Sequence, residues 1–190
     1  MFGGSVDQTG FGIFAVLVRD IARGKLLVTD ISNGHNGFAF SPNGTYLYWL
    51  SRSDKGRPST IFRRAIGKRG DTRIYDEKNW CIVSMRITAA GGYVVIRMFN
   101  GDMTEVRMVS MDCPTTEPFV LQPRTQGLRY NVDEWNGKLL ILTDADDAID
   151  FKLMMAGADK LGRAGWQPFV AHYAGRLIAA VHPFKGHLVR

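Results

Sequence analysis

One turn returns four times along this 190-residue chain at nearly constant spacing. The four turns end at Gly44, Gly92, Gly137 and Gly186, so the intervals are 48, 45 and 49 residues. Each turn is followed by a similar apolar segment, and these segments are Thr45–Leu50, Tyr93–Arg97, Lys138–Leu142 and His187–Arg190. A tandem period of this length with several strands in each unit is typical of β-propeller blades. The repeat therefore predicts a tandem array of one β unit.

Each period also contains three other short segments that are expected to be strands. The first strands are expected at Gly37–Phe40, Ile82–Ile87, Arg129–Asp133 and Leu177–Val181, the third at Pro58–Arg63, Met103–Val109 and Ala148–Met154, and the fourth at Lys25–Val28, Arg73–Tyr75, Pro118–Gln122 and Gln167–Val170. Four short strands per period form an antiparallel meander. We therefore predict an all-β fold, a partial β-propeller of about three to four blades of four-stranded antiparallel sheets. The blade-like units are expected at about 1–35, 36–78, 79–124, 125–172 and an incomplete 173–190.

The composition is that of a folded chain. Hydrophobic residues make up 45% and aromatic residues 11%, which excludes disorder. The most apolar stretch near the start, residues 13–20, is too short for a membrane span and contains Arg19. The first residues also lack the pattern of a signal peptide. We therefore expect a cytoplasmic protein with no membrane partner.

The formal net charge is +6, yet the basic residues are scattered singly along the chain. Only Arg57–Arg73 is locally dense, and we expect a solvated face there, with a phosphate-binding patch as the alternative. No nucleic-acid partner is predicted. Cys81 enters an expected strand and Cys113 lies in a loop before Pro114, and disulfides are rare in reducing compartments, so two free thiols are expected rather than a disulfide.

No motif for catalysis, metal binding or a cofactor stands out. A Gly-x-Ser-x-Gly nucleophile elbow is absent, and the four histidines lack the spacing of metal ligands. Three aspartates resemble a calcium cluster but lack the glycine and the distal glutamate of an EF-hand, so Asp144, Asp146 and Asp147 are expected to be turn residues. Asn43–Gly44 between two apolar segments predicts a type I′ turn. We predict no catalytic residue, metal or cofactor in this chain.

Two ordered sets of segments point to a known family. The set Ser5–Gly10, Arg19–Gly24, Phe38–Gly44 and Leu47–Leu50 resembles the amino-terminal propeller of the prolyl oligopeptidase family. A second set resembles its oligopeptidase B branch and consists of Gly56–Pro58, Ile61–Gly67, Ile74–Lys78, Thr104–Arg107, Pro123–Gly127 and Trp166–Gln167. The resemblance covers nearly the whole chain. The departures are Arg64, where many relatives carry histidine, and Trp80–Cys81, where they carry an aromatic pair.

The resemblance implies a serine peptidase that cleaves short peptides, in this branch after Arg or Lys. Its Ser-Asp-His triad belongs to a carboxy-terminal α/β-hydrolase domain, which a seven-bladed propeller caps and closes to all but oligopeptides. Because the chain ends at Arg190 within a blade, we expect the substrate-gating propeller portion alone, without activity. Its expected partners are the hydrolase domain of the same parent protein and oligopeptide substrates. The alternative is a stand-alone propeller for protein interactions, although the Gly-His and Trp-Asp markers of WD40 blades are missing.

The first strand of each blade lines the central channel of a propeller. Side chains alternate along a strand, so the channel receives either Val83, Met85 and Ile87 or Ile82, Ser84 and Arg86. We favour the second set, because a wet channel suits Ser84 and Arg86. By the same reasoning Arg129, Asn131 and Asp133 are channel candidates, with polar strand-edge positions as the alternative. Incomplete blades leave apolar sheet faces uncovered, so self-association is also expected.

Overall fold

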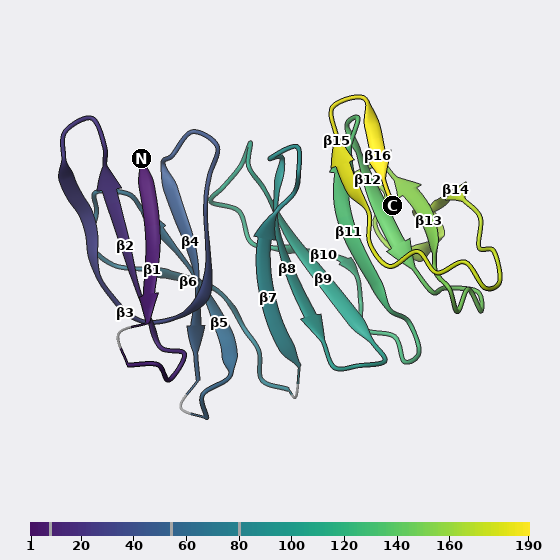
Figure 1. Ribbon diagram of the computed structural model, residues 1–190, viewed down its shortest axis with the longest axis horizontal. Coiled ribbons are helices and arrows are strands. Elements are labelled where there is room, and N and C mark those ends of the chain that lie inside the picture. Colours follow the sequence, from purple (N-terminus) through teal and green to yellow (C-terminus); the bar gives the residue numbers. More distant parts are fainter. Residues whose placement is uncertain (8, 54, 80) are drawn as a thin grey trace. The chain divides into compact units, whose positions relative to one another are not determined.

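The computed structural model describes residues 1–7, 9–53, 55–79 and 81–190, and these residues form an all-β structure (Figure 1). Its strands are β1 (Phe2–Asp7), β2 (Phe14–Asp20), β3 (Lys25–Phe40), β4 (Tyr46–Arg52), β5 (Pro58–Ala65), β6 (Thr72–Asp76), β7 (Ile82–Ile87), β8 (Tyr93–Phe99), β9 (Thr104–Ser110), β10 (Phe119–Gln122), β11 (Tyr130–Trp135), β12 (Lys138–Thr143), β13 (Lys152–Ala156), β14 (Gln167–Val170), β15 (His182–Phe184) and β16 (His187–Val189). Within the described residues the helical content is one 3-10 turn, η1 (Arg163–Gly165). No helix there has the length and apolarity to cross a bilayer.

The chain forms two compact units. Unit 1 comprises Met1–Arg86 and Cys113–Glu117, and unit 2 comprises Ile87–Asp112 and Pro118–Arg190. The sheets are antiparallel and follow chain order: β1 to β6, β7 to β10, β11 to β14, and the pair β15–β16. The second and third sheets are four-stranded meanders, which confirms the predicted content of a blade.

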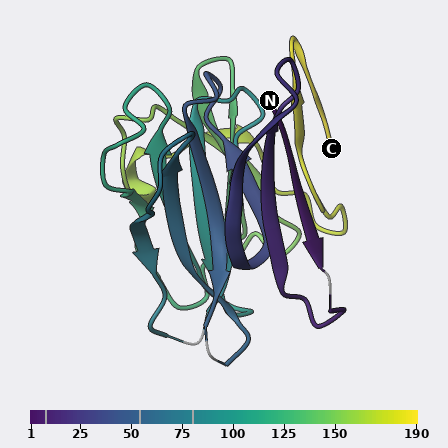
Figure 2. The ribbon, with the colours of Figure 1, turned by 90° about the vertical axis from the view of Figure 1, so that its left-hand side faces the viewer.

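The first sheet has six strands because β3 is long. It runs for 16 residues and pairs with β2 at Val18↔Val28 and with β4 at Phe38↔Trp49, with register shifts in both pairings. Figure 2 shows β1, β2 and β3 side by side in purple. The expected boundary between units 1–35 and 36–78 therefore falls inside a continuous strand. The Gly and Asn residues at 33–37 lie within this strand, at a register shift between Gly34 and Phe38 in its pairing with β4.

The core of unit 1 is built largely from residues of β2 and β4. Val16, Val18 and Leu47 are fully buried, and Trp49 stacks on Phe62 with ring centroids 4.7 Å apart. Alternate residues of a strand face one side of its sheet, so one face of β2 lies in the core, whereas β4 is covered on both faces because Leu47 to Ser51 are all buried. The apolar segments of the sequence thus become buried strands.

Arg64 is an exception to the expected solvated basic face, whose residues Arg57, Lys68, Arg69 and Arg73 are exposed. Its side chain is only 5% exposed. It donates to Asp71 through Nε (2.8 Å) and Nη2 (2.5 Å), and through Nη1 to Asp30. The indole Nε1 of Trp49 donates to the same Asp71 carboxylate at 3.0 Å. Arg64, one member of the dense basic stretch, therefore forms internal ion pairs, because two carboxylates compensate its buried charge.

Unit 1 should lose stability in acid. Hydrogen bonds from Arg64 and Lys78 hold the pKa of Asp30 and of Asp76, respectively, below the ordinary value of 3.8. A carboxyl group with a lowered folded-state pKa contributes stability that is complete above its unfolded pKa, about 3.9, and is lost as the pH falls through the folded value. We expect the melting temperature to be flat between about pH 7 and 5 and to fall below about pH 4. Thermal unfolding followed by circular dichroism checks this, and a rise in melting temperature on acidification would contradict it.

A segment of the connection between β9 and β10 belongs to unit 1. The carbonyl of Pro114 accepts hydrogen bonds from the Tyr48 hydroxyl at 2.9 Å and from Arg63 Nη1 at 2.8 Å. Burial raises the pKa of Tyr48 to about 12, so this hydroxyl stays a donor at neutral pH. Cys113 in the same segment is exposed and Cys81 is buried, and the two are not joined in a disulfide, as predicted.

The turn at Ser41–Gly44 is not a type I′ turn. A type I′ turn needs positive φ at both central residues, whereas Gly44 (φ 67°) is the only one of these four described residues with positive φ. The amide of Gly44 instead donates to the carbonyl of Ser41 at 2.8 Å. The predicted geometry occurs at Asn136 (φ 51°) and Gly137 (φ 70°), between β11 and β12. The prediction was wrong at Asn43 because the loop there is longer than two residues.

The equivalent of Gly44 in the next repeat is Gly91 rather than Gly92. Gly91 has φ 84°, and its amide donates to the carbonyl of Thr88 at 2.9 Å, as the amide of Gly44 does to Ser41. Counting from Gly44 through Gly91, Gly137 and Gly186, the spacings are 47, 46 and 49 residues. The structural repeat is thus slightly more regular than the sequence suggested.

Two expected strands differ from the structure. The third strand of the fourth unit, expected at Ala148–Met154, is β13 at Lys152–Ala156, because positive φ angles at Asp146, Asp147 and Phe151 keep the preceding residues in turns. As predicted, Asp146 and Asp147 are turn residues. No strand forms at Leu177–Val181, where the amide of Ile178 donates to the carbonyl of Asp150 at 3.0 Å. The hairpin begins later, with β15.

The core of unit 2 is organised around Tyr130, which is almost fully buried. Its hydroxyl accepts a hydrogen bond from the amide of Val106 (2.8 Å) and donates one to the carbonyl of Gln122 (2.6 Å). Val106 and Gln122 are register partners on β9 and β10, next to a register shift between Val120 and Gln122. The hydroxyl therefore stands in for a ladder hydrogen bond at a bulge. Burial raises the pKa of Tyr130, so its proton stays in place.

Candidate functional site

The candidates on β7 occupy alternating positions of that strand. Ile82 and Ser84 are exposed, Val83 between them is buried, and Arg86 is half-buried. Ile82 and Ser84 thus share one side of the strand. That this side lines a channel remains a prediction.

Two of the second group of candidates make contacts within unit 2. Arg129 lies just before β11, where its amide (2.7 Å) and its Nε (2.6 Å) both donate to the Asp144 carboxylate. This pair closes the open end of the β11–β12 hairpin. Asn131 is exposed on β11, and Asp133 Oδ1 accepts the amide of Ala89 at 2.7 Å. The structure therefore assigns Arg129 and Asp133 contacts within unit 2 that the sequence did not predict.

Glu134 is a site residue that sequence reasoning missed. Its Oε2 accepts hydrogen bonds from Thr88 Oγ1 at 2.9 Å and from the Gly92 amide at 3.0 Å. A carboxylate of β11 thus fastens the turn between β7 and β8. The sequence identified Glu134 only as part of its own turn, and no local pattern links residues more than 40 positions apart.

Gly92 is required by this contact. A Cβ atom added at Gly92 would lie 2.5 Å from Oε2 of Glu134. We expect Gly92→Ala to lower the free energy of unfolding by about 1–3 kcal/mol, because the carboxylate must leave its two donors to make room. Chemical denaturation of a double-mutant cycle with Glu134→Ala checks the cause, because the alanine at 92 should then cost much less. An equal cost in both backgrounds would contradict this explanation.

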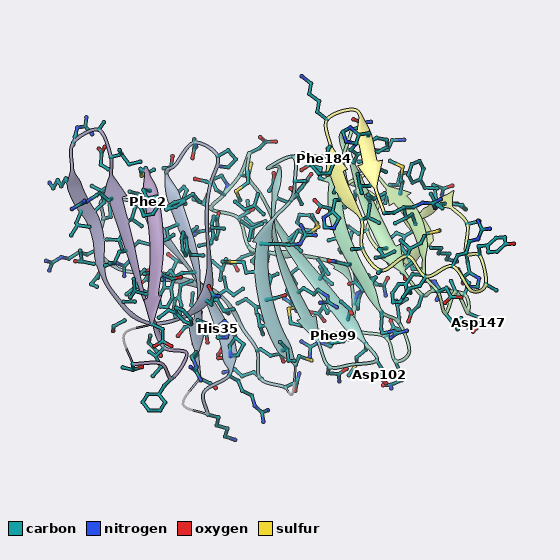
Figure 3. The ribbon with its side chains drawn as sticks, viewed as in Figure 1. Phe2, His35, Phe99, Asp102, Asp147 and Phe184 are labelled. Atoms are coloured by element: carbon teal, nitrogen blue, oxygen red, sulfur yellow. The ribbon has the colours of Figure 1, made fainter. Side chains whose placement is uncertain are left out.

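Three of the repeating turns of unit 2 surround one cavity of about 520 Å³. Ala89 and Ala90 come from the first turn, Glu134 to Gly137 from the second, and Pro183 to Lys185 from the third. Trp135 Nε1 donates to the carbonyl of Phe184 at 3.0 Å, which ties the second turn to the third. Figure 3 labels Phe184 at the end of β15. The cavity combines aromatic walls, a carboxylate and a lysine, as small-molecule and peptide sites do.

Comparison with known proteins identifies a family with this architecture. Residues 4–190 match the family model described as the prolyl oligopeptidase N-terminal β-propeller domain. Protease 2 of Moraxella lacunata is 21% identical over 96% of this chain and 27% of its own length. The human protein named prolyl endopeptidase-like is 27% identical over 68% of this chain and 18% of its own length. The chain thus spans about a quarter of the length of the first curated relatives.

Solved structures show the same fold. Oligopeptidase B from Leishmania major has a TM-score of 0.82 at 22% identity, covering 90% of this chain and 24% of that one. Oligopeptidase B from Trypanosoma brucei has a TM-score of 0.80 at 18% identity, covering 94% and 25%. The prediction of a partial propeller is confirmed by the family match and by the four-stranded sheets. The chain belongs to the prolyl oligopeptidase family, as part of its N-terminal β-propeller domain.

Proposed function

We propose that this chain is the substrate-gating part of an oligopeptidase B-like serine endopeptidase that cleaves short peptides after Arg or Lys. The observation that carries the proposal is the match of residues 4–190 to the propeller domain of this family. The likeness to protease 2 and to two oligopeptidase B structures supports the choice of branch. The catalytic residues belong, in this proposal, to a carboxy-terminal α/β-hydrolase domain of a cytoplasmic parent protein, and the chain alone is inactive.

In the gating role, the propeller excludes large substrates and takes no part in the chemistry of peptide cleavage. A narrow channel admits flexible peptides and excludes folded proteins, and closure of the domains keeps water from the reaction. Ser84, Arg86, Asn131 and Asp133 are the proposed channel residues on β7 and β11. Arg129 acts, in this proposal, at the channel's edge through its ion pair with Asp144.

The test uses the protein encoded by the whole reading frame that contains this chain. We expect cleavage of a blocked arginine-containing dipeptide substrate and of a longer unfolded peptide, but not of a folded protein with an exposed arginine. Ser84→Trp should lower kcat/KM for the longer peptide more than for the dipeptide, because it narrows the proposed channel. Lys68→Trp, on an exposed turn, is the matched control. A frame without a hydrolase domain would favour the stand-alone interaction module instead.

We expect the isolated chain to self-associate. Large apolar side chains stay exposed on its first and last hairpins, among them Phe2 (63% exposed) on β1 and Phe184 (52%) on β15. Exposed apolar patches at sheet edges favour association. Sedimentation velocity across a range of concentrations should show a mass that rises with concentration. A single monomeric species at every concentration would contradict this expectation.

A further inference from the structure

Asparagine followed by glycine occurs five times in this chain, and this dipeptide can modify itself. The five asparagines are Asn33, Asn36, Asn43, Asn100 and Asn136. The amide nitrogen of the glycine can attack the side-chain carbon Cγ of the asparagine, because glycine has no side chain to hinder the approach or to restrict the backbone. Asparagine is one of the thermolabile residues. In a folded chain, the reaction depends on whether the structure lets that nitrogen reach Cγ.

The fold holds the glycine nitrogen away from Cγ at the first three pairs. Asn33 and Asn36 lie in β3, where the extended backbone directs the next nitrogen away from the side chain. At Asn43 the amide of Gly44 donates to the carbonyl of Ser41 at 2.8 Å. The side chain of Asn43 is also fixed, because its Oδ1 accepts the Ser41 hydroxyl at 2.7 Å. These three pairs must open locally before they can react.

Asn136 is protected by the conformation of its hairpin turn. Its φ of 51° lies in the left-handed region, where ψ is about +30 to +60°. Near this ψ the nitrogen of Gly137 lies on the opposite side of the Cα–C bond from Cβ. Ring closure therefore requires a large rotation within the turn, and the flanking register pair Trp135↔Lys138 resists that rotation.

Asn100 has none of these protections. It is exposed and lies in the connection between β8 and β9, where Figure 3 labels its neighbours Phe99 and Asp102. Within the part of the chain that the structure describes, neither the amide of Gly101 nor the side chain of Asn100 has a hydrogen-bond partner. The hydrogen bond that closes this connection, from the Asn100 amide to the Met103 carbonyl, is long at 3.4 Å. The glycine nitrogen is therefore free to approach Cγ as the loop moves.

We infer that Asn100 is a site of spontaneous deamidation and that the fold protects the other four Asn-Gly pairs. The nitrogen of Gly101 forms a bond to Cγ of Asn100, and the bond from Cγ to Nδ2 breaks. The side-chain nitrogen leaves as ammonia, with the proton that Gly101 loses. Water then opens the cyclic imide at Cγ, which gives aspartate, or at the backbone carbonyl carbon, which gives isoaspartate. The net reaction consumes water and releases ammonia, and it needs no oxidant or cofactor.

The modification changes both the charge and the backbone of the β8–β9 connection. Either product adds a carboxylate two residues from Asp102, which accepts a hydrogen bond from Gln126 Nε2. In isoaspartate the main chain also runs through the side chain of residue 100, so the connection that sets the register of this hairpin becomes longer. The inference goes beyond the proposed function and does not depend on it.

The experiment follows each asparagine by mass spectrometry of tryptic peptides while the chain is kept at mildly alkaline pH, folded or in guanidinium chloride. Trypsin cleaves after Lys and Arg, so residues 98–107 carry Asn100, residues 130–138 carry Asn136, and residues 26–52 carry the other three. In the folded chain Asn100 should convert at least about tenfold faster than each of the others, because they react only after local opening. In denaturant the five rates should agree within about threefold, because each asparagine then precedes an unrestrained glycine.

A conservative variant tests the chemistry of the step. Asn100→Gln keeps a primary amide at the same exposed position, but its ring closure would form a larger and less favourable ring. Residues 98–107 of this variant should therefore keep their amide, and the other four asparagines should convert as before. The inference is wrong if Asn100 of the folded chain converts no faster than the other four. It is also wrong if Asn100→Gln loses its amide as fast as the unchanged chain does.

Discussion

Replacing Arg64 by alanine is expected to lower the free energy of unfolding by about 2–4 kcal/mol, which is the largest effect we predict. Removing one partner of a buried ion pair leaves an uncompensated charge, which typically costs about 3–5 kcal/mol. Asp71 keeps the donor from Trp49 and is 18% exposed, so water recovers part of that cost. Urea unfolding followed by tryptophan fluorescence measures the change.

Two comparisons identify the cause of the Arg64 effect. Arg69→Ala, at an exposed position of the same basic stretch, should change the free energy of unfolding by less than about 0.5 kcal/mol. Arg64→Met combined with Asp71→Asn removes both charges and should restore much of the loss, because no buried ion then lacks a partner. If Arg64→Ala and Arg69→Ala lower the free energy of unfolding equally, the ion pairs of Arg64 contribute no more to stability than an exposed arginine does.

Tyr130→Phe is expected to lower the free energy of unfolding by about 1–3 kcal/mol. The substitution keeps the ring against Trp166 but removes the hydroxyl between the Val106 amide and the Gln122 carbonyl. The buried amide of Val106 and the partly buried carbonyl of Gln122 then lose this partner. Urea unfolding measures the loss, and Tyr173→Phe, at an exposed tyrosine, is the matched control with little expected change.

Hydrogen exchange gives a second measurement for Tyr130. The Val106 amide should exchange faster in Tyr130→Phe, because its acceptor is gone. An unchanged stability and exchange rate would mean that β9 and β10 close directly into a regular ladder, so that the tyrosine hydroxyl is dispensable.

Much of the strand order could be predicted from the sequence, because its signals are local. A turn ending in glycine and the apolar segment after it identified the second strand of each unit, and these segments became β4, β8, β12 and β16. Such signals depend on residues within one hairpin. They predict a strand correctly where the turn and the side chains of that hairpin set its register.

The failures have a common physical origin in contacts between distant residues. Arg64 looked like a surface cation because Asp30 lies 34 residues away in sequence. Glu134 looked like a turn residue because its donors lie in the previous repeat. Leu177–Val181 is an apolar segment and was expected to form a first strand, but of these residues only Ile178 is buried. Hydrophobic pattern alone does not tell whether a neighbouring strand is present to pair.

The continuous strand β3 makes cooperative opening a property of all of unit 1. A backbone segment bonded to β2 along its first part and to β4 along its last part cannot release one neighbour without loosening the other. The slowest-exchanging amides of β2, β3 and β4 should therefore report one common free energy of opening, as in a single foldon. The amino-terminal repeat thus owes its protection from proteases to the repeat that follows it.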